Sequence, residues 1–186
     1  MGISCITRNT YCILPFLLLI LIITPSSSSL SPKDIVTKEL LNKFCSGSDI
    51  TNPNLCLKWL NRTTSISING LINLTVKETQ EFGLKNQALM SKLARSSGKD
   101  LNLKGSYEAC VDSHGQAIKE LEKAQKFLSS SSFKQAVSAI SNAFDKASNC
   151  KDAFEGPSNE PPMVANRIED FTFMCYIDWS LASLVN

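Results

Sequence analysis

Apolar and small side chains recur at alternating intervals of four and three residues between Leu103 and Leu128. These positions are Leu103, Tyr107, Cys110, His114, Ala117, Leu121, Ala124 and Leu128, and most of the residues between them are charged or polar. This spacing keeps one side of a helix turned towards a partner and the other towards water. It predicts a long amphipathic helix.

Three further stretches repeat the pattern. The first holds Ile68, Ile72, Thr75, Thr79, Phe82, Asn86, Leu89 and Leu93, the second runs through Phe133, Val137, Ile140, Phe144 and Ala147 to Phe154, and the third carries Val164, Ile168, Phe171, Cys175 and Leu181 after Pro161-Pro162. Breaks at 96–98, 129–132 and 155–159 separate the four stretches, and Ser132 is expected to cap a helix starting at Phe133.

No window alternates at period two, so we predict an all-α fold without a sheet. Long amphipathic helices with short connections form antiparallel bundles. The fold class is therefore an antiparallel four-helix bundle. Two short helices, Pro32 to Phe44 and Leu55 to Asn61, are expected to precede it as an N-terminal helical hairpin around the turn Ser46 to Asn54.

The first residues have a different character. Arg8 precedes an apolar run from Ile13 to Ile23, and small polar residues follow at Ser26 to Ser29. These are the parts of a secretory signal, and the run is shorter than the roughly 20 residues that span a membrane. We predict a signal peptide at 1–28 and one domain at 29–186.

Secretion changes how the cysteines are interpreted. Cys5 and Cys12 leave with the signal, and five cysteines remain in a compartment where disulfides persist. Cys45 and Cys56 flank a short segment with Gly47 and Pro53, which suits closure of a hairpin. Cys110 and Cys150 are equally distant from position 130, so antiparallel helices would bring them to the same height. Cys175 is expected to be a free buried thiol, with an intermolecular bridge as the alternative.

Composition and charge exclude several functions. The chain of 186 residues has 19 Lys and Arg against 17 Asp and Glu, which favours neither nucleic-acid nor membrane binding. Its single histidine, His114, lies on an apolar helix face, where a packed side chain is expected and a pH sensor is the alternative. No catalytic, metal or cofactor site is predicted. Sequons at Asn61 and Asn73 are possible glycosylation sites.

Several local features in order resemble the plant invertase/pectin methylesterase inhibitor family over the whole mature chain. They are Cys45, Asn52-Pro53-Asn54-Leu55-Cys56-Leu57, Leu103 to Cys110, Ala117 to Leu121, Ala143-Phe144 and Cys150 to Pro157. The resemblance implies a four-helix bundle with an N-terminal hairpin, the same two disulfides, and a fifth, unpaired cysteine near Cys175. It also implies a protein inhibitor rather than an enzyme.

The segment Phe154 to Pro157 and the block Leu103 to Cys110 are similar to the pectin methylesterase inhibitor branch. Invertase inhibitors often carry Pro-Lys-Phe at the turn where this sequence has Ser131-Ser132-Phe133. The resemblance therefore implies a secreted inhibitor of a plant pectin methylesterase in the apoplast or cell wall. An inhibitor of acid invertase, with a vacuolar location possible, and a non-inhibitory interaction protein are the alternatives.

A binding surface follows by hypothesis from the same resemblance. In the esterase branch, polar residues of the second long helix and its neighbours cover the pectin-binding cleft. The matching positions are Asp112, Ser113, Gln116 and Lys119, joined by Gln135, Ser138 and Asn142 on the next helix. Related inhibitors tend to have acidic residues where Gln116 and Lys119 stand here. A monomer is expected to form a one-to-one complex with the enzyme.

Overall fold

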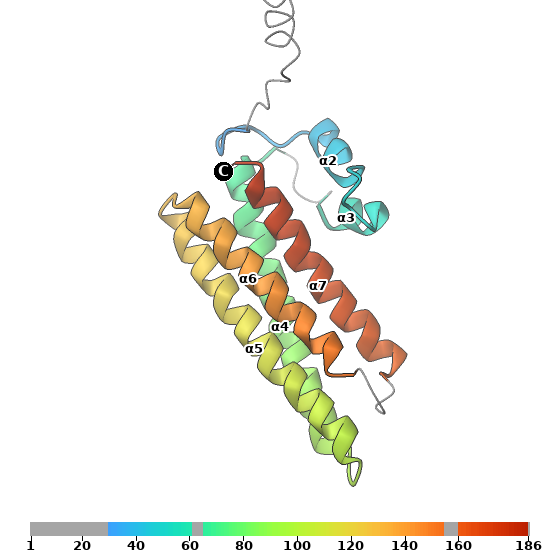
Figure 1. Cartoon of the computed structure of the whole chain (residues 1–186). Coiled ribbons are helices and arrows are strands. Elements are labelled where there is room, and N and C mark those ends of the chain that lie inside the picture. Colours follow the sequence, from blue (N-terminus) through green and yellow to red (C-terminus); the bar gives the residue numbers. More distant parts are fainter. Residues whose placement is uncertain (1–29, 61–64, 155–159, 186) are drawn as a thin grey trace, which may run out of the picture.

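Four long helices lie side by side, and two short helices sit beside one end of this bundle (Figure 1). The computed structural model describes residues 30–60, 65–154 and 160–185. In these ranges the short helices are α2 (Lys38–Cys45) and α3 (Pro53–Leu60), and the long ones are α4 (Ile68–Ser96), α5 (Leu101–Ser129), α6 (Phe133–Asp152) and α7 (Pro162–Ser183). The predicted signal peptide at 1–28, the sequon at Asn61 and the break at 155–159 lie outside the described residues.

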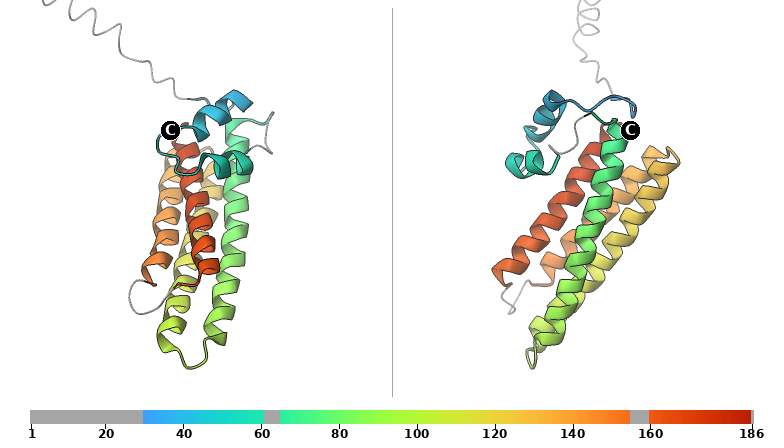
Figure 2. Two further views of the ribbon diagram at one scale, coloured as in Figure 1. Left: turned by 90° about the vertical axis from the view of Figure 1, so that its right-hand side faces the viewer. Right: turned by 180° about the vertical axis from the view of Figure 1, so that it is seen from behind.

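The order of packing around the bundle decides which faces can reach a partner. α5 packs against α4 and α6, and α7 closes the ring by packing against α6 and α4. α4 therefore lies diagonally across from α6, and the view from behind shows α4 in front (Figure 2). The predicted antiparallel four-helix bundle with an N-terminal hairpin is confirmed.

The seam of the second long helix is confirmed closely. Tyr107, Cys110, His114, Ala117, Leu121, Ala124 and Leu128 are all buried in α5, and Leu103 is half-buried. Polar side chains cap two of the long helices: the Asp100 carboxylate accepts the Leu103 N–H of α5 at 3.0 Å, and the Ser67 hydroxyl oxygen accepts the Gly70 N–H of α4 at 3.1 Å.

The seam of α6 differs from the prediction. Its fully buried side chains are small, except for Ile140, and they are Ala136, Ala139, Ala143, Ala147 and Cys150. Phe133, Val137 and Phe144 are only half-buried and, at 100° per residue, share one side of α6, where the Phe144 ring centroid lies 5.8 Å from that of Tyr176 on α7. Small residues allow two helix backbones to approach closely. The α5–α6 pair is therefore joined through alanines, and the aromatic rings lie at its edge.

Two boundary predictions were wrong in part. The segment from Pro32 to Thr37 is a turn at Pro32 to Asp34 followed by non-helical chain, and α2 begins only at Lys38. The carbonyls of Pro32 and Asp34 accept the N–H groups of Asn69 and Ile68 at 3.0 and 2.8 Å, so this strap satisfies donors at the start of α4 that the helix cannot satisfy itself. α3 begins at Pro53 and not at Leu55.

The serine cap of α6 is also a correction. Ser132 occupies the N-cap position as predicted, but its side chain makes no capping hydrogen bond. Its hydroxyl instead lies 3.1 Å from the hydroxyl of Ser130. Ser131 takes a positive φ of 57°, which turns the chain sharply between α5 and α6.

The two ends of the described chain meet beside the bundle. The Leu30 N–H donates to the Leu184 carbonyl at the end of α7, at 3.1 Å. The strap then continues past the start of α4, where the Val36 N–H donates to the Ile66 carbonyl at 2.8 Å. An isolated bridge between Ile35 and Ser67 is the only β pairing in the described residues.

Both predicted disulfides are confirmed. Cys45 and Cys56 join α2 to α3 across 11 residues, and Cys110 and Cys150 join α5 to α6 across 40 residues. The Cα atoms of the second pair are 4.5 Å apart, which fits the close α5–α6 approach. Cys175 is free and buried on α7, as predicted.

The core contains two ionisable side chains that are fully covered. His114 has 0% exposure, packs edge-on against Phe171 with ring centroids 5.0 Å apart, and has no hydrogen-bond partner for either ring nitrogen among the described residues. Gly83 leaves room for this layer, since a Cβ there would stand 2.7 Å from the Phe171 ring. His114 is therefore a packed side chain of the core, as expected from its place on the apolar face of the helix.

Asp178 on α7 is the second covered group, also with 0% exposure. Neither carboxyl oxygen has a hydrogen-bond partner of ordinary geometry in the described part, and the Thr75 hydroxyl donates to the Ile72 carbonyl instead. Burial raises the pKa of Asp178 to about 8, an effect that Thr75 and Thr79 partly offset. Burial lowers the pKa of His114 to about 4. Both side chains are therefore neutral in the folded protein between these values.

These two groups predict the pH dependence of the free energy of unfolding. Because the pKa of His114 falls from 6.5 to about 4 on folding, its contribution is complete above pH 6.5 and is lost as the pH falls towards 4. Because the pKa of Asp178 rises from 3.8 to about 8, its contribution is complete below pH 3.8 and is lost as the pH rises towards 8. The two slopes oppose each other between about pH 4 and 6.5, and stability should fall above 6.5. Urea titrations of the oxidised protein measure this.

Two variants separate the contributions. Asp178→Asn should abolish the fall above pH 6.5 and leave stability rising between pH 4 and 6.5. His114→Leu should extend the fall over the whole range from pH 4 to 8. A wild-type midpoint that rises between pH 6.5 and 8 contradicts this account of the core.

The two disulfides should differ in their effect on stability. In the loop-entropy relation, closing 40 residues contributes about 4 kcal/mol and closing 11 residues about 3 kcal/mol. The double variant Cys110→Ser/Cys150→Ser should therefore lose more stability than Cys45→Ser/Cys56→Ser, as measured by urea unfolding. The Cys110–Cys150 bridge also sets the α5–α6 register. An equal or smaller loss of stability on its removal would therefore mean that the alanine seam sets the register without it.

Candidate functional site

The predicted binding residues lie on the outer surface of α5 and α6. Asp112, Gln116 and Lys119 on α5 are exposed, as are Gln135, Ser138 and Asn142 on α6. Ser113 is half-buried, and its hydroxyl donates to the Ala109 carbonyl at 2.9 Å. Six of the seven side chains are therefore free to contact a partner protein.

The α5–α6 register decides which of these residues are neighbours. The helices are antiparallel and are joined at Cys110 and Cys150, so residues equally far from the bridge lie at similar heights. Asn142 then stands level with Ile118, between Gln116 and Lys119. Ser138 and Gln135 continue towards the serine turn. We call these seven residues the α5–α6 face.

Part of this face also borders α4. Asp112, Gln116 and Lys119 line a shallow hollow together with Gln87 of α4 and Gly115 and Glu122 of α5. The Gln87 side chain donates to the Val111 carbonyl at 3.0 Å, and a Cβ at Gly115 would stand 2.6 Å from its amide nitrogen. The sequence did not indicate Gln87 or Gly115, because nothing in its periodicity shows which neighbour each side of α5 faces.

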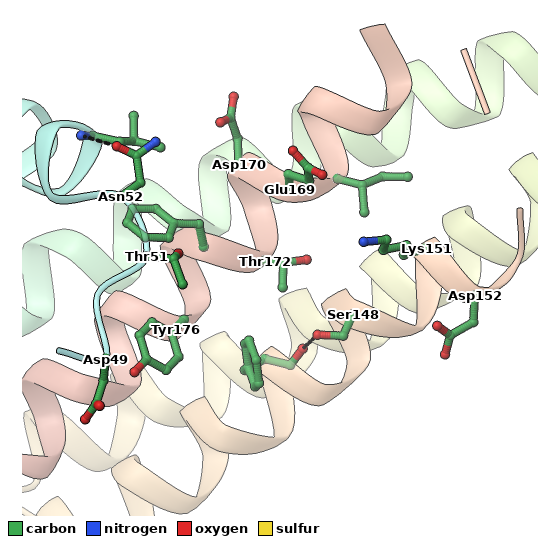
Figure 3. Close-up of a pocket in the computed structure, with 14 residues that line it drawn as sticks. Asp49, Thr51, Asn52, Ser148, Lys151, Asp152, Glu169, Asp170, Thr172 and Tyr176 are labelled. Atoms are coloured by element: carbon green, nitrogen blue, oxygen red, sulfur yellow. Dashed lines mark hydrogen bonds between the residues drawn. The ribbon is translucent and has the colours of Figure 1, made fainter. Parts of the chain in front are cut away.

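A second surface feature was not predicted. A groove runs between α6, α7 and the loop that joins α2 to α3 (Figure 3). Its apolar lining comes from Leu55, Phe144, Ile168, Phe173 and Tyr176, and its polar lining is Asp49, Thr51, Asn52, Ser148, Lys151, Asp152, Glu169, Asp170 and Thr172. We call it the α6–α7 groove. The half-buried Phe144 contributes to it because α6 turns its alanines, and not its aromatic rings, towards α5.

The α6–α7 groove is acidic. It has four carboxylates, on Asp49, Asp152, Glu169 and Asp170, against the single ammonium of Lys151. Ion pairs within 4 Å in the described ranges are both on α5, Lys104 with Glu108 and Lys123 with Glu120. Within the described residues, none of the four groove carboxylates therefore has a cation within 4 Å.

The buried polar residues do not form a reactive site. His114 is enclosed by the core, and burial raises the pKa of the Cys175 thiol well above its ordinary value, which keeps it protonated and unreactive. No group of three or more His, Cys, Asp or Glu side chains in the described residues could hold a metal ion. None of the described helices is both long and apolar enough to cross a membrane.

The second sequon falls inside a helix. Asn73 is half-buried on α4, and its side-chain amide donates to the backbone carbonyl and to the side-chain oxygen of Asn69, each at 3.0 Å. Glycosylation at Asn73 remains a prediction.

Comparisons with known proteins agree on one family. Residues 39–181 match the family model described as plant invertase/pectin methylesterase inhibitor. A pectinesterase inhibitor from Actinidia deliciosa is 33% identical over 151 residues, which cover 80% of this chain and 79% of that protein.

The chain is also similar to solved structures of pectin methylesterase inhibitors. Mutant form A of a pectin methylesterase inhibitor from Arabidopsis aligns with a TM-score of 0.66 and 27% identity over 72% of this chain and 89% of that chain. A pectin methylesterase inhibitor from Arabidopsis thaliana aligns with a TM-score of 0.61 and 24% identity over 81% of this chain and 99% of that chain. At that identity the second alignment bears on the fold alone.

Proposed function

The chain belongs to the plant invertase/pectin methylesterase inhibitor family, and we propose that it inhibits a plant pectin methylesterase by covering the enzyme's pectin-binding cleft in a one-to-one complex. The observation that carries this proposal is the similarity to the pectinesterase inhibitor from Actinidia deliciosa, at 33% identity over most of both chains. The family resemblance predicted from the cysteines and the surrounding motifs is confirmed. Since the family consists of inhibitors, the chain is not itself an enzyme.

The turn before α6 favours the esterase over an invertase. The Pro-Lys-Phe of many invertase inhibitors is replaced here by Ser131-Ser132-Phe133, and Phe133 packs against the core instead of standing free. A ring that packs against its own core in this way is poorly placed to enter another protein's cleft. This supports the esterase as the target.

The α5–α6 face is the surface that we assign to the enzyme contact. It is polar and exposed, and it lies on the two helices that are joined by both the alanine seam and a disulfide. A rigid surface loses little conformational freedom on binding. Protein complexes of ordinary size bury about 1,600 Å² in total, which the exposed sides of two long helices can supply. Inhibition would then be steric, because the inhibitor occupies the space of the pectin chain.

Secretion into the apoplast or cell wall fits this target. The predicted signal at 1–28 would direct the domain at 29–186 out of the cell, and loss of Arg8 with the signal leaves a nearly neutral domain. Two intact disulfides suit an oxidising compartment. We propose that the mature protein is a monomer until it meets the enzyme.

The first prediction concerns the target. The oxidised, signal-free protein should slow a plant pectin methylesterase and leave an acid invertase unaffected, because its α6 turn lacks the free Pro-Lys-Phe motif. Initial rates of both enzymes, measured side by side at mildly acidic pH, test this. Inhibition of invertase alone would move the chain to the other branch of its family. Inhibition of neither enzyme by the folded protein would show that the bundle serves another interaction.

The second prediction concerns the surface. Asp112→Arg and Gln116→Trp should each raise the inhibition constant by about tenfold, since reversed charge or added bulk at an interface commonly costs one to a few kcal/mol. Thermal unfolding should be unchanged, because both side chains are exposed. Glu81→Arg is the matched control: it reverses a charge on the exposed side of α4, diagonally across the bundle from α6.

Variants of the α6–α7 groove decide the alternative placement. Asp170→Lys should leave inhibition close to the wild-type level. If Asp170→Lys weakens inhibition while Asp112→Arg and Gln116→Trp do not, the enzyme contacts the groove, and the α5–α6 face is the wrong assignment.

A further inference from the structure

The outward side of α4 carries a row of basic side chains. Lys77, Lys85, Lys92 and Arg95 are all exposed, and we call them the α4 stripe. At 100° per residue, their positions fall within a quarter of the helix circumference. Between Lys77 and Arg95 the row extends for about 27 Å along a straight helix.

Little on α4 offsets this charge. Glu81 is the one exposed acidic residue on the same side of the helix, since Glu78 is half-buried and accepts a hydrogen bond from the Trp59 ring N–H at 3.0 Å. The sequence has no Asp or Glu from Phe82 to Ser96. Neither ion pair within 4 Å in the described ranges involves the stripe, since both lie on α5. Four of the 17 acidic residues lie in the α6–α7 groove, which has no lining residue on α4.

The residues between the cations make the stripe partly apolar. Leu74 and Leu84 are 36% and 49% exposed on the same side, and Ala88 is exposed as well. No aromatic ring stands between the cations on this side. The surface is therefore a straight row of separated positive charges with small apolar gaps.

Three of the four cations, Lys77, Lys85 and Lys92, also stay free in the proposed complex, whereas Arg95 shares a hollow with Asp112 of the α5–α6 face. α4 lies diagonally across from α6, and its outward side faces the viewer when the bundle is seen from behind (Figure 2). An enzyme bound to the α5–α6 face would leave Lys85 and Lys92 open to solvent. A second ligand could then occupy α4 at the same time.

We propose that the α4 stripe binds a linear polyuronate, the carboxylate-bearing form of pectin that demethylation produces. A polyuronate has one carboxylate on each sugar, so a straight row of separated cations complements it, and its pyranose faces can lie on the apolar gaps. Lys and Arg both form charge-assisted hydrogen bonds with carboxylates. A nucleic acid fits less well, because single strands bind through interleaved aromatic side chains. The choice of pectin as the source rests on the proposed function.

Binding at this surface should be weak in physiological salt and stronger at low ionic strength. The cations are exposed, and the screening length is only about 8 Å at 0.15 M salt. In the wall matrix, where uronate groups are dense, weak binding would still hold the inhibitor close to the substrate of its target enzyme. The methyl-esterified polymer lacks the charge and should not be held.

Enzyme-free binding tests the proposal. The oxidised, signal-free protein is titrated at low salt with polygalacturonate and, separately, with highly methyl-esterified galacturonan of similar length. Calorimetry measures the affinity for each polymer. Wild type should bind the first and not the second. Lys92→Gln/Arg95→Gln should weaken binding by about tenfold, at roughly 1 kcal/mol or less for each cation facing an anionic surface. The matched control is Lys123→Gln/Lys126→Gln, which removes two exposed cations from α5 outside the α5–α6 face and should bind like wild type.

Several outcomes would overturn the inference. They are equal binding of both polymers, an unchanged affinity in the α4 variant, an equal loss in the α5 control, or tighter binding of a single-stranded DNA of matched charge. The assay contains no esterase, so it is independent of inhibition. A protein that binds polygalacturonate through α4 but inhibits no esterase would leave this inference standing and refute the proposed function. A protein that inhibits the esterase without binding the polymer would do the reverse.

Discussion

The close pairing of α5 and α6 is the contact on which the rest of the bundle depends. Ala136, Ala139, Ala143 and Ala147 bring α6 against α5, and the Cys110–Cys150 bridge locks the height at which the two helices meet. Because the contact uses small side chains, the larger ones of α6 are left over for its other side, where Phe144 faces α7. One choice of residue size thus sets both the polar α5–α6 face and the lining of the α6–α7 groove.

The distribution of charge is the second organising feature. The totals of basic and acidic residues nearly cancel, yet the fold places four carboxylates and one ammonium in the α6–α7 groove and four cations in the α4 stripe. The α6–α7 groove and the outward side of α4 therefore present opposite charge to the surroundings. A protein of this kind is close to neutral when seen from far away and strongly polar at contact distance, where most electrostatic recognition takes place.

The sequence predicted the helices, their antiparallel order and both bridges, because each follows from a periodicity or from distances along the chain. The α5 seam was predicted nearly residue by residue, since large and small apolar residues there share one face. In α6 the same reasoning gave Phe133 and Phe144 more weight than the alanines, so the predicted buried side of the helix was rotated from the observed one by part of a turn. The strap at 32–37 was predicted to be helical, because no local pattern shows that its carbonyls accept hydrogen bonds from the start of α4. The α6–α7 groove and the α4 stripe depend on which helices are neighbours, and periodicity carries no information about that.

The contact between Leu30 and Leu184 has a topological consequence. Both ends of the described chain are joined by one backbone hydrogen bond, so the path of the chain through the helices is an almost closed loop. The gap between Leu30 and Leu184 lies at one end of the bundle. The opposite end carries the tight turn at Gly98, which is exposed and has a positive φ. A circular permutant that links Leu184 to Leu30 and opens the chain at Gly98 would keep every helix and both bridges intact. The order in which the helices are synthesised is thus separable from the architecture they form.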